Sequence, residues 1–465
     1  MLHPADFILI ALYFLALVVV SFYRIGRSDT EESFLLSGRT LTLPAFVATL
    51  VSTWYGGILG IGEYTFMFGV SQWIVFGLPY YLFAVLFAVF LAGRIRENRA
   101  LTLPEALANA YSPRAGIAGA VLVFLLVNPA PYLFMAGMLF RFVLGSEASI
   151  LLFAAITALF SALYVAASGF RAVVRTDAIQ VVLMYTGFAV LLWFAAAEAG
   201  SPLTLLKALP ETHTSLLGGQ PFTYLLVWFF IALWTFVDPG FHQRAAAAKT
   251  PQTARKGIFL SVGFWLLFDM MTLFTGLYAV VLVGTTDHAA LIYPELAMRL
   301  LPVGLTGLFF LTLLATIMST LDSFLLLSGQ TLGRDLIGRL RGKGSSVATT
   351  RLGLVVSALL ALLLIAVYPS VVSLWYVIGS VLLPGLLIPV LGIYISVFRL
   401  PDRLILPALV VPTCVSALWL VLGTVAAEDL FSYAFLGVEP FYPGLLASLL
   451  LWAGGRLHGA LTFRS

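Results

Sequence analysis

The feature that most constrains this chain is a succession of apolar runs, each about as long as a bilayer is thick. A helix needs about 20 largely apolar residues to cross the hydrocarbon core. Of the 465 residues, 61% are hydrophobic and 10% are charged, whereas soluble domains carry about 25% charged residues. A bilayer is therefore the expected solvent, and the fold class is predicted to be all-α integral membrane protein.

Thirteen runs are long enough to be spans. They cover residues 5–23, 44–68, 71–93, 116–140, 148–167, 173–197, 221–241, 257–283, 302–332, 350–368, 370–396, 403–424 and 439–458. No basic residues precede the first run and no small-residue cleavage site follows it, so we read it as a retained helix rather than a signal peptide. The run at 302–332 exceeds one crossing, and we expect it to tilt or to extend into water.

The basic residues predict the orientation. Cytoplasmic loops of membrane proteins carry an excess of Lys and Arg. With the N-terminus outside and the C-terminus inside, all of the 25 Lys and Arg except Arg141, Lys207 and Arg299 fall in inner segments. An error in the number of spans would disrupt this alternation, so the charge pattern supports both thirteen spans and the N-out, C-in orientation.

Polar, glycine-rich interruptions break two of the apolar spans. One reads STWYGG at residues 52–57, and the other reads WTFVDPG at 234–240. Transporters bind their solutes near the midplane, where unwound helices expose backbone groups. The alternative is that the glycines only allow close helix packing. Matched breaks in two spans favour the transporter interpretation.

The two broken spans begin two five-span blocks, 44–197 and 221–396. Because five is odd, the blocks have opposite orientations, as in an inverted repeat. A leading helix at 5–23 and two trailing helices at 403–458 complete a single membrane transport domain over residues 1–465.

The ninth span carries hydroxyl groups on one helical face. Thr316, Ser319, Thr320 and Ser323 follow the spacing i, i+3, i+4, i+7, and Asp322 lies beside them. Sodium is a hard cation that prefers oxygen ligands, and hydroxyls with nearby carbonyls can replace its water shell. The alternative is that each hydroxyl bonds back to the carbonyl four residues earlier.

Ionisable side chains inside apolar spans are costly, so each is a functional candidate. The chain has five such carboxylates, at Glu63, Asp177, Asp238, Asp269 and Asp322. Asp177 and Asp238 lie near cytoplasmic span ends, where water or Arg can satisfy them. For Asp269 a packing hydrogen bond and a transport role both remain open.

Short motifs in a fixed order resemble those of the sodium:solute symporter family. They are SGR at 37–39, LTLPE at 101–105, SGFRAV at 168–173 followed by TD at 176–177 and Q at 180, QR at 243–244 with AAK at 247–249, and MSTLDS at 318–323. Members of that family carry sugars, proline, pantothenate, sialic acids, small carboxylates or iodide. The resemblance implies the five-plus-five inverted repeat of the leucine-transporter fold, with sodium as the coupling ion and no organic cofactor.

The resemblance also implies ligands for sodium. The side chains of Ser319 and Thr320 and the backbone carbonyls of Ser52, Tyr55 and Thr316 would form the main site. Some members have a second site, which Asp177 and Ser323 match. Asp322 stands there in place of an expected hydroxyl, and it could either strengthen that site or replace the ion by a proton.

For the solute, the resemblance points away from sugars. Sugar-carrying members place amide or carboxylate side chains just after the first break, where this chain has Ile58 and Leu59. The amides of broken helices suit a carboxylate, which favours a small carboxylate or an amino-acid-like solute. The candidate lining residues are Trp54, Gly56, Gly57, Asn128, Trp234 and Tyr376.

The function predicted is import of a small organic solute by sodium-coupled symport and alternating access, in a multi-pass protein of a prokaryotic plasma membrane. A proton-coupled symporter of the same fold is the nearest alternative. A transporter-like membrane sensor is another, although the chain ends soon after the last span. An enzyme is disfavoured because no nucleophile–base pair is visible. The scattered His and the single cysteine, Cys414, argue against a metal other than sodium. No nucleic-acid partner is expected, and the oligomeric state stays open.

Overall fold

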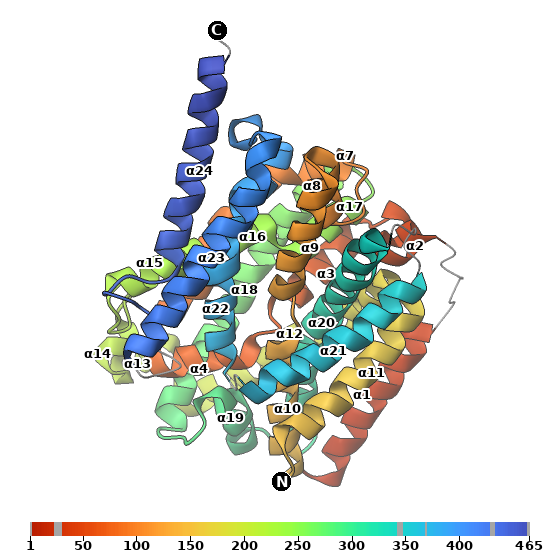
Figure 1. Ribbon diagram of the computed structural model, residues 1–465. Helices are drawn as coiled ribbons and strands as arrows, with labels where there is room; N and C mark the ends of the chain where they lie inside the picture. Colours follow the sequence, from red (N-terminus) through yellow and green to blue (C-terminus); the bar gives the residue numbers. More distant parts are fainter. Residues whose placement is uncertain (1, 23–29, 342–346, 368–369, 428–432, 463–465) are drawn as a thin grey trace.

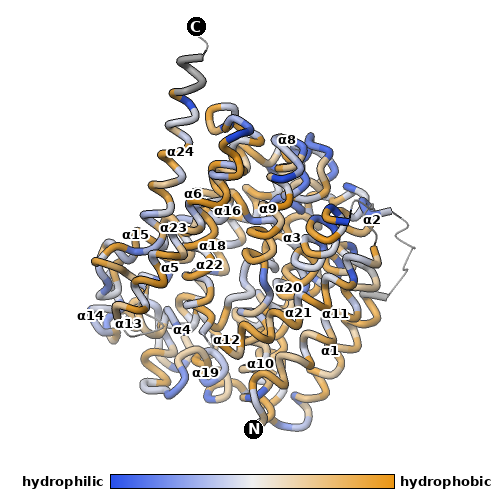
Figure 2. The backbone as a smooth tube through the Cα atoms, viewed as in Figure 1, coloured by the Kyte–Doolittle hydropathy of each residue, from blue (hydrophilic) through white to orange (hydrophobic). Residues whose placement is uncertain are grey.

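The computed structural model describes residues 2–22, 30–341, 347–367, 370–427 and 433–462. These residues are almost entirely helical and form no strand, only the isolated bridges Leu41–Ala248 and Phe435–Val438. The helices pack into one bundle with its two termini at opposite ends (Figure 1). Apolar residues cover the sides of the bundle, and hydrophilic residues concentrate at its ends (Figure 2). The predicted all-α membrane fold is confirmed.

The first block contains two interrupted spans, one segmented span and two continuous ones. Its helices are α3 (Leu43–Trp54), α4 (Ile58–Phe68), α5 (Ser71–Phe76), α6 (Leu78–Phe87), η2 (Ala88–Ala92), α7 (Gly93–Glu97), α9 (Pro113–Leu126), α10 (Ala130–Leu144), α11 (Ile150–Ser168) and α12 (Phe170–Ala199). The second block repeats the plan with α15 (Phe222–Ile231), α16 (Trp234–Val237), α17 (Pro239–Ala247), α18 (Pro251–Leu282), α20 (Leu305–Gln330), η4 (Thr331–Gly338), α21 (Val347–Val367) and α22 (Val371–Tyr394).

Other helices flank or connect the two blocks. The leading helix is α1 (Pro4–Phe22), and the trailing helices are α23 (Asp402–Ala427) and α24 (Phe441–Thr462). Short connecting helices are α2 (Glu31–Leu36), η1 (Ser37–Arg39), α8 (Leu103–Ala110), α13 (Pro202–Ala208), α14 (Glu211–Thr214), η3 (Ala289–Leu291), α19 (Ile292–Leu300) and η5 (Ser396–Phe398). In Figure 1, α24 runs past the end of the bundle on the side of the C-terminus.

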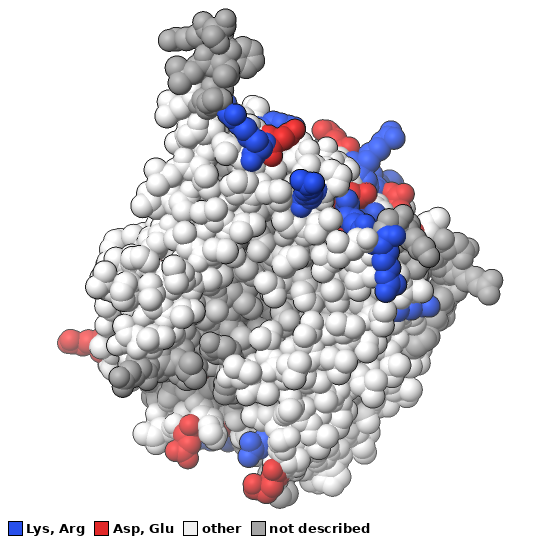
Figure 3. Space-filling model, in the orientation of Figure 1, with Lys and Arg blue, Asp and Glu red and all other residues white. Residues whose placement is uncertain are grey.

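A helix lies at each of the thirteen ranges expected from the sequence, but the number of spans is not confirmed. By length and apolarity, ten helices of the described residues could cross a membrane, or eleven when α3 and α4 count as one bent span. The leading helix qualifies only as a shorter apolar helix, over Pro4–Val20. Lys and Arg gather mainly around one end of the bundle, near α2 and α8 (Figure 3). That distribution agrees with the positive-inside rule, and the orientation stays a prediction.

Both predicted helix breaks are present. Tyr55, Gly56 and Gly57 separate α3 from α4, and the two helices are bent by 55°. A Cβ atom at Gly56 would overlap the Thr320 side chain, and one at Gly57 would overlap the Trp375 ring, so only glycine allows these neighbours to approach.

The second break separates α15, α16 and α17. Asp238 ends the interruption by capping α17, since its Oδ1 accepts a hydrogen bond of 2.8 Å from the amide of Phe241. Pro239 follows at the first helical position, where a missing amide hydrogen costs nothing. A third break, which the sequence analysis missed, separates α9 from α10 at Val127–Pro129 and contains Asn128.

Helix α20 occupies the centre of the bundle. Every residue from Phe309 to Gln330 is buried, whereas only about a third of the most apolar stretch is buried in each of α11, α12 and α23. Helices α1, α3, α10, α11 and α12 pack around α20. Its hydroxyl groups and Asp322 are therefore enclosed by protein rather than by lipid.

Because α18 packs closely against α3, we expect replacement by alanine to affect stability differently at two glycines of α18. A Cβ at Gly257 would overlap the buried Phe46 ring, whereas one at Gly263 meets nothing within 4 Å. We expect Gly257→Ala to destabilise the fold by ~1–3 kcal/mol through overpacking, and Gly263→Ala to be neutral or slightly stabilising. Thermal unfolding of the purified variants in detergent measures both, and equal melting temperatures would contradict this packing.

Candidate functional site

The hydroxyl face of α20 meets the broken end of α3. The Thr320 hydroxyl donates to the carbonyl of Thr53 over 2.7 Å, and the Ser319 hydroxyl donates to Asp177 Oδ1 over 2.6 Å. Ser319 and Thr320 are at most 1% exposed. Side chains from both repeats therefore meet at one buried polar cluster.

The other residues predicted for the main sodium site lie close by, with different roles for their side chains. Ser52 is fully buried on α3, one residue before Thr53. The Tyr55 hydroxyl points away and donates to the carbonyl of Trp265 over 2.8 Å. The Thr316 hydroxyl bonds back to the carbonyl of Thr312 over 2.8 Å, which is the local alternative noted above. For Tyr55 and Thr316, only the backbone carbonyl remains as a ligand candidate.

The chemistry of this cluster suits a small hard cation. The last carbonyls of a helix have no intrahelical partner and carry a partial negative charge. The end of α3 presents such carbonyls to the hydroxyls of Ser319 and Thr320 in a buried place. Oxygen donors of this kind are the ligands that hard cations prefer. The sequence analysis predicted the carbonyl of Ser52 as a sodium ligand. It did not predict the carbonyl of the neighbouring Thr53, which contacts Thr320.

Two of the three residues proposed for a second cation site lie in the same cluster. Asp177, on α12, is fully buried and accepts hydrogen bonds from the hydroxyls of Thr49 and Ser319. Ser323 accepts a hydrogen bond of 2.9 Å from Arg244 Nη2, and the same Nη2 lies 3.7 Å from Asp177 Oδ2. Arg244 belongs to α17, and the sequence analysis did not identify it as part of the cluster.

Asp322 lies apart from these groups. Its Oδ2 accepts a hydrogen bond from the hydroxyl of Tyr164 on α11, and its Oδ1 has no hydrogen-bond partner among the described residues. The carboxyl group is fully buried. The structure therefore turns Asp322 toward α11 instead of toward Asp177 and Ser323.

A cavity of about 130 Å³ adjoins the polar cluster. Four of the six predicted lining residues, Trp54, Gly57, Asn128 and Trp234, face it. Its remaining walls are mostly aromatic and aliphatic, and polar side chains of Thr53, Asn128, Thr235, Asp238 and Arg244 also line it. An engineered apolar cavity of about 150 Å³ holds benzene, so this space is suited to a small organic molecule.

The other two predicted lining residues lie elsewhere. Gly56 packs against Thr320, at the ion cluster rather than at the cavity. Tyr376 donates a hydrogen bond to Glu439 and stacks on Tyr433, with ring centroids 5.1 Å apart. Tyr376 thus connects α22 to the segment that precedes α24.

The structure gives Asp269 a packing contact. The Tyr81 hydroxyl, on α6, donates to its carboxylate, so the pair joins α18 to α6. Neither residue is among those that line the cavity. Glu63 lies half-buried on α4, also outside the cavity lining.

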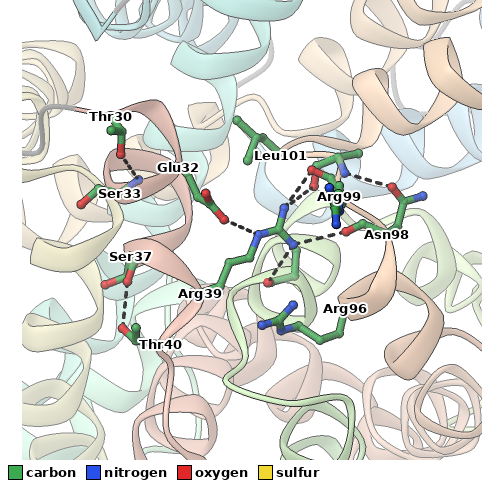
Figure 4. Close-up of polar contacts among 12 residues, drawn as sticks. Thr30, Glu32, Ser33, Ser37, Arg39, Thr40, Arg96, Asn98, Arg99 and Leu101 are labelled. Carbon is green, nitrogen blue, oxygen red and sulfur yellow. Dashed lines mark hydrogen bonds and ion pairs between the residues drawn. The ribbon is translucent and has the colours of Figure 1, made fainter.

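At the end of the bundle where the basic residues gather, Arg39 fastens several chain segments together (Figure 4). Its guanidinium pairs with Glu32 over 2.6 Å and donates to the carbonyls of Asn98, Arg99, Ala100 and Ala246 at 2.9–3.5 Å. Ser37, Gly38 and Arg39 have positive φ angles, and this turn directs the Arg39 side chain toward the loop between α7 and α8.

A second ionic cluster lies near Arg39. Arg334 pairs with Glu31 and Glu105 at 3.2 Å and with Asp335 at 3.0 Å. Thr102 and Glu105, from the LTLPE motif, also cap the start of α8: the amide of Glu105 donates to Thr102 Oγ1, and the amide of Leu101 donates to Glu105 Oε2. These contacts join α2, α8 and η4 at this end of the bundle.

The fold and the site together define a class of protein. A bundle of apolar helices that encloses a cavity, beside two broken helices from opposed blocks, has the architecture of a secondary transporter. The model of the sodium:solute symporter family matches residues 34–398. The chain belongs to the sodium:solute symporter family, whose members are transporters rather than enzymes, and the family predicted from the sequence is confirmed.

Curated relatives are similar over most of this chain. The sodium/myo-inositol cotransporter 2 of Sus scrofa is 26% identical over 429 residues, which cover 80% of this chain and 62% of the relative. The human sodium/myo-inositol cotransporter is 25% identical over 448 residues, which cover 80% and 60%. The chain therefore spans about three fifths of the length of these relatives.

Solved structures support the fold. A Na⁺-coupled sialic acid symporter in a substrate-bound, outward-open state superposes with a TM-score of 0.76 at 14% identity, over 99% of this chain and 98% of the other. Mhp1, a nucleobase-cation-symport-1 family transporter, gives 0.61 at 17% identity, over 94% and 96%. MhsT, in complex with L-phenylalanine, gives 0.53 at 14% identity, over 92% and 100%.

The contacts of Arg39 predict that its removal opens this end of the bundle. Gln330 lines a small cavity just beneath the loop of residues 98–101. In a Cys414→Ser, Gln330→Cys background, we expect Arg39→Gln to raise the rate of labelling by a charged thiol reagent by about tenfold, because charge-assisted hydrogen bonds contribute about 1.5–3 kcal/mol each.

The matched control for this experiment is Arg114→Gln, an exposed arginine at the start of α9. We expect it to leave the labelling rate unchanged. Equal labelling rates in the Arg39 and Arg114 variants would show that the Arg39 contacts do not hold this end closed.

Proposed function

We propose that this protein is a sodium-coupled symporter that imports a small organic solute by alternating access. Sodium and the solute are the transported species, and no organic cofactor takes part. The observation that carries the proposal is the meeting of the Ser319 and Thr320 hydroxyls with the broken end of α3. The family supports sodium as the coupling ion, and the cavity beside the cluster supports a small solute.

In this proposal sodium acts by holding two helices together. Thr320 already donates to the carbonyl of Thr53 across the contact between α20 and α3. A bound sodium ion would replace that single hydrogen bond by several oxygen ligands from both helices, and so stabilise one arrangement of the two blocks. Loss of the ion to the cytoplasm, where sodium is scarce, then frees α3 to move. The ligand set is proposed to be Ser319 and Thr320 with carbonyls of Ser52, Tyr55 and Thr316, to which the geometry adds Thr53.

The membrane location follows from the family and the apolar helices. The protein is a multi-pass membrane protein. A prokaryotic plasma membrane is our proposal, supported by the short segments between the helices, while the relatives named above are mammalian.

The test of the ion site is sodium binding to the purified protein. We expect a saturable change in tryptophan fluorescence and melting temperature with sodium, and none with potassium or choline, because Trp54 lies next to Thr53 at the end of α3. In Ser319→Ala/Thr320→Ala the sodium affinity should fall at least about tenfold, since each lost oxygen ligand costs the ion part of its coordination. An unchanged affinity would overturn this assignment of the ligands.

A proton-coupled symporter is the second candidate, and Asp322 is the observation that favours it. Its carboxyl is buried, with only the Tyr164 hydroxyl as a hydrogen-bond partner among the described residues. In that case the fluorescence response would follow pH instead of sodium, and Asp322→Asn would abolish it. A sodium response that survives in Asp322→Asn excludes this candidate.

For the solute, we propose a small carboxylate or an amino-acid-like molecule. Ile58 and Leu59, just after the first break, are buried and apolar, so they offer no hydrogen bonds to a polyol. Gly57 lines the cavity at the start of α4, where backbone amides of a helix N-terminus favour an anion. The two relatives described above are named for myo-inositol, a neutral polyol, which is the competing solute class.

Matched pairs of compounds test the solute class. In the presence of sodium, we expect propionate and L-alanine to raise the melting temperature and to be taken up by proteoliposomes, and propionamide and myo-inositol to do neither. The reason is that the amides at the start of α4 need an anionic partner. Uptake of myo-inositol, with no uptake of either acid, would contradict the proposed solute class while leaving sodium coupling intact.

A further inference from the structure

One carboxylate in the wall of the solute cavity has no ion-pair partner of its own. Asp238 is half-buried and lines the cavity, and no Lys, Arg or His in the described part of the chain forms an ion pair with it. Arg244 offsets part of its charge, but the ion pair of Arg244 is with Asp177, at 3.7 Å. Because a negative charge inside a transmembrane bundle is costly, Asp238 is suited to a cationic group that enters the cavity.

The helix cap accounts for one oxygen of this carboxylate, but not for its charge. Asp238 Oδ1 accepts a hydrogen bond of 2.8 Å from the amide of Phe241 at the start of α17. Asparagine and aspartate cap helices about equally well, so the cap by itself does not require an ionised group. The negative charge of Asp238 is therefore free to recognise a ligand.

Aromatic rings make up much of the wall around this carboxylate. Nine of the 22 residues that line the cavity are Phe, Tyr or Trp. Three of them, Tyr80, Tyr132 and Trp234, lie close enough to Asp238 to interact with its carboxylate. The face of an aromatic ring attracts an organic cation, and aromatic cages are typical sites for quaternary ammonium groups. The wall around Asp238 has the composition of such a cage.

The uncharged polar side chains of the wall already have partners within the protein. These are Thr53 Oγ1 with Arg244 Nη2 at 2.6 Å, Asn128 Oδ1 with the amide of Ala130 at 3.0 Å, and the Thr235 hydroxyl with the carbonyl of Ala232 at 3.0 Å. A sodium ion at Asp238 would therefore lack the several oxygen ligands that a hard cation needs. A primary ammonium would find few acceptors for its N–H groups, whereas a fully methylated ammonium has no N–H group to satisfy.

We propose that the solute is a small zwitterion, and that its methylated ammonium group lies against Asp238 among the aromatic rings. This inference rests on the proposed function, which places a solute carboxylate at the start of α4, and it adds a positive charge on the same solute. The two charged groups would meet different broken spans, because α4 follows the first break and Asp238 caps α17 after the second. One solute would then join the two blocks through its two charges.

Two probes of the same shape isolate the effect of the positive charge. Glycine betaine and 3,3-dimethylbutyrate have the same carboxylate and the same three methyl groups, and they differ only in whether a cationic nitrogen or a neutral carbon carries the methyl groups. We measure both by isothermal titration calorimetry on the purified full chain in sodium. The affinity for glycine betaine should be at least about tenfold higher, because the carboxylate and the ring faces attract only the cation.

Asp238→Asn tests whether this carboxylate is the partner. The variant keeps a capping oxygen for α17 and nearly the same side-chain volume, and it should remove most of the preference by weakening the binding of glycine betaine alone. Its sodium affinity should not change, because Asp238 is not among the proposed sodium ligands. The matched control is Asp269→Asn, which neutralises a buried carboxylate outside the cavity lining and should keep the preference.

Distinct outcomes separate this inference from the proposed function. Equal affinities of the wild-type protein for the two probes, or no binding of glycine betaine where propionate binds, would overturn the zwitterion and leave the carboxylate class in place. A preference that survives in Asp238→Asn would overturn the assignment to Asp238. The wild-type comparison decides the solute charge even if the variant does not fold. Binding of myo-inositol with no binding of any of these acids would overturn the proposed solute class, and this inference with it.

Discussion

The contact between the broken end of α3 and the hydroxyl face of α20 is the interaction on which the rest of this structure depends. In the middle of a membrane protein, a helix cannot end unless other groups satisfy its last carbonyls. Thr320 supplies one such hydrogen bond, to the carbonyl of Thr53, and Gly56 lets α20 come close enough to do so. The same exposed carbonyls are what a sodium ion needs. The same contact therefore satisfies the end of α3 and forms part of the proposed ion site.

The charges around this contact connect the two blocks. Asp177 comes from the first block and Arg244 from the second, and their ion pair lies one side chain away from Ser319. Because the pair is buried, the position of either group depends on the other. A cation that enters beside Asp177 alters the field at Arg244, on the half-helix α17 that follows the second break. Ion binding can therefore affect both broken helices through the neighbouring side chains of Ser319, Asp177 and Arg244.

The sequence predicted the helices, the two glycine-containing breaks and the hydroxyl face, because each depends on local spacing. It did not predict the break at Asn128, although Asn128, Pro129 and Pro131 interrupt the apolar run there and an Asn-Pro dipeptide is a turn signal. Arg244 was missed for a different reason: at the end of a span it reads as a cytoplasmic charge, and the direction of a long side chain depends on tertiary packing. The direction of Asp322 could have been found, since two residues turn a helix by about 200°. That rotation sets Asp322 opposite Thr320 and toward α11, where Tyr164 lies.

Helix α17 also joins the ion cluster to the end of the bundle where Arg39 lies. Arg244 contacts Asp177 near the middle of this nine-residue helix, and two residues later the carbonyl of Ala246 accepts a hydrogen bond from Arg39. Both residues belong to one uninterrupted helix, so a displacement at one of them is passed on to the other. If the Arg39 contacts at this end separate, α17 is free to shift, and its shift would carry Arg244 with it. Opening of the bundle at Arg39 would then also move the charge of Arg244 relative to Asp177, the carboxylate that contacts the proposed sodium ligand Ser319.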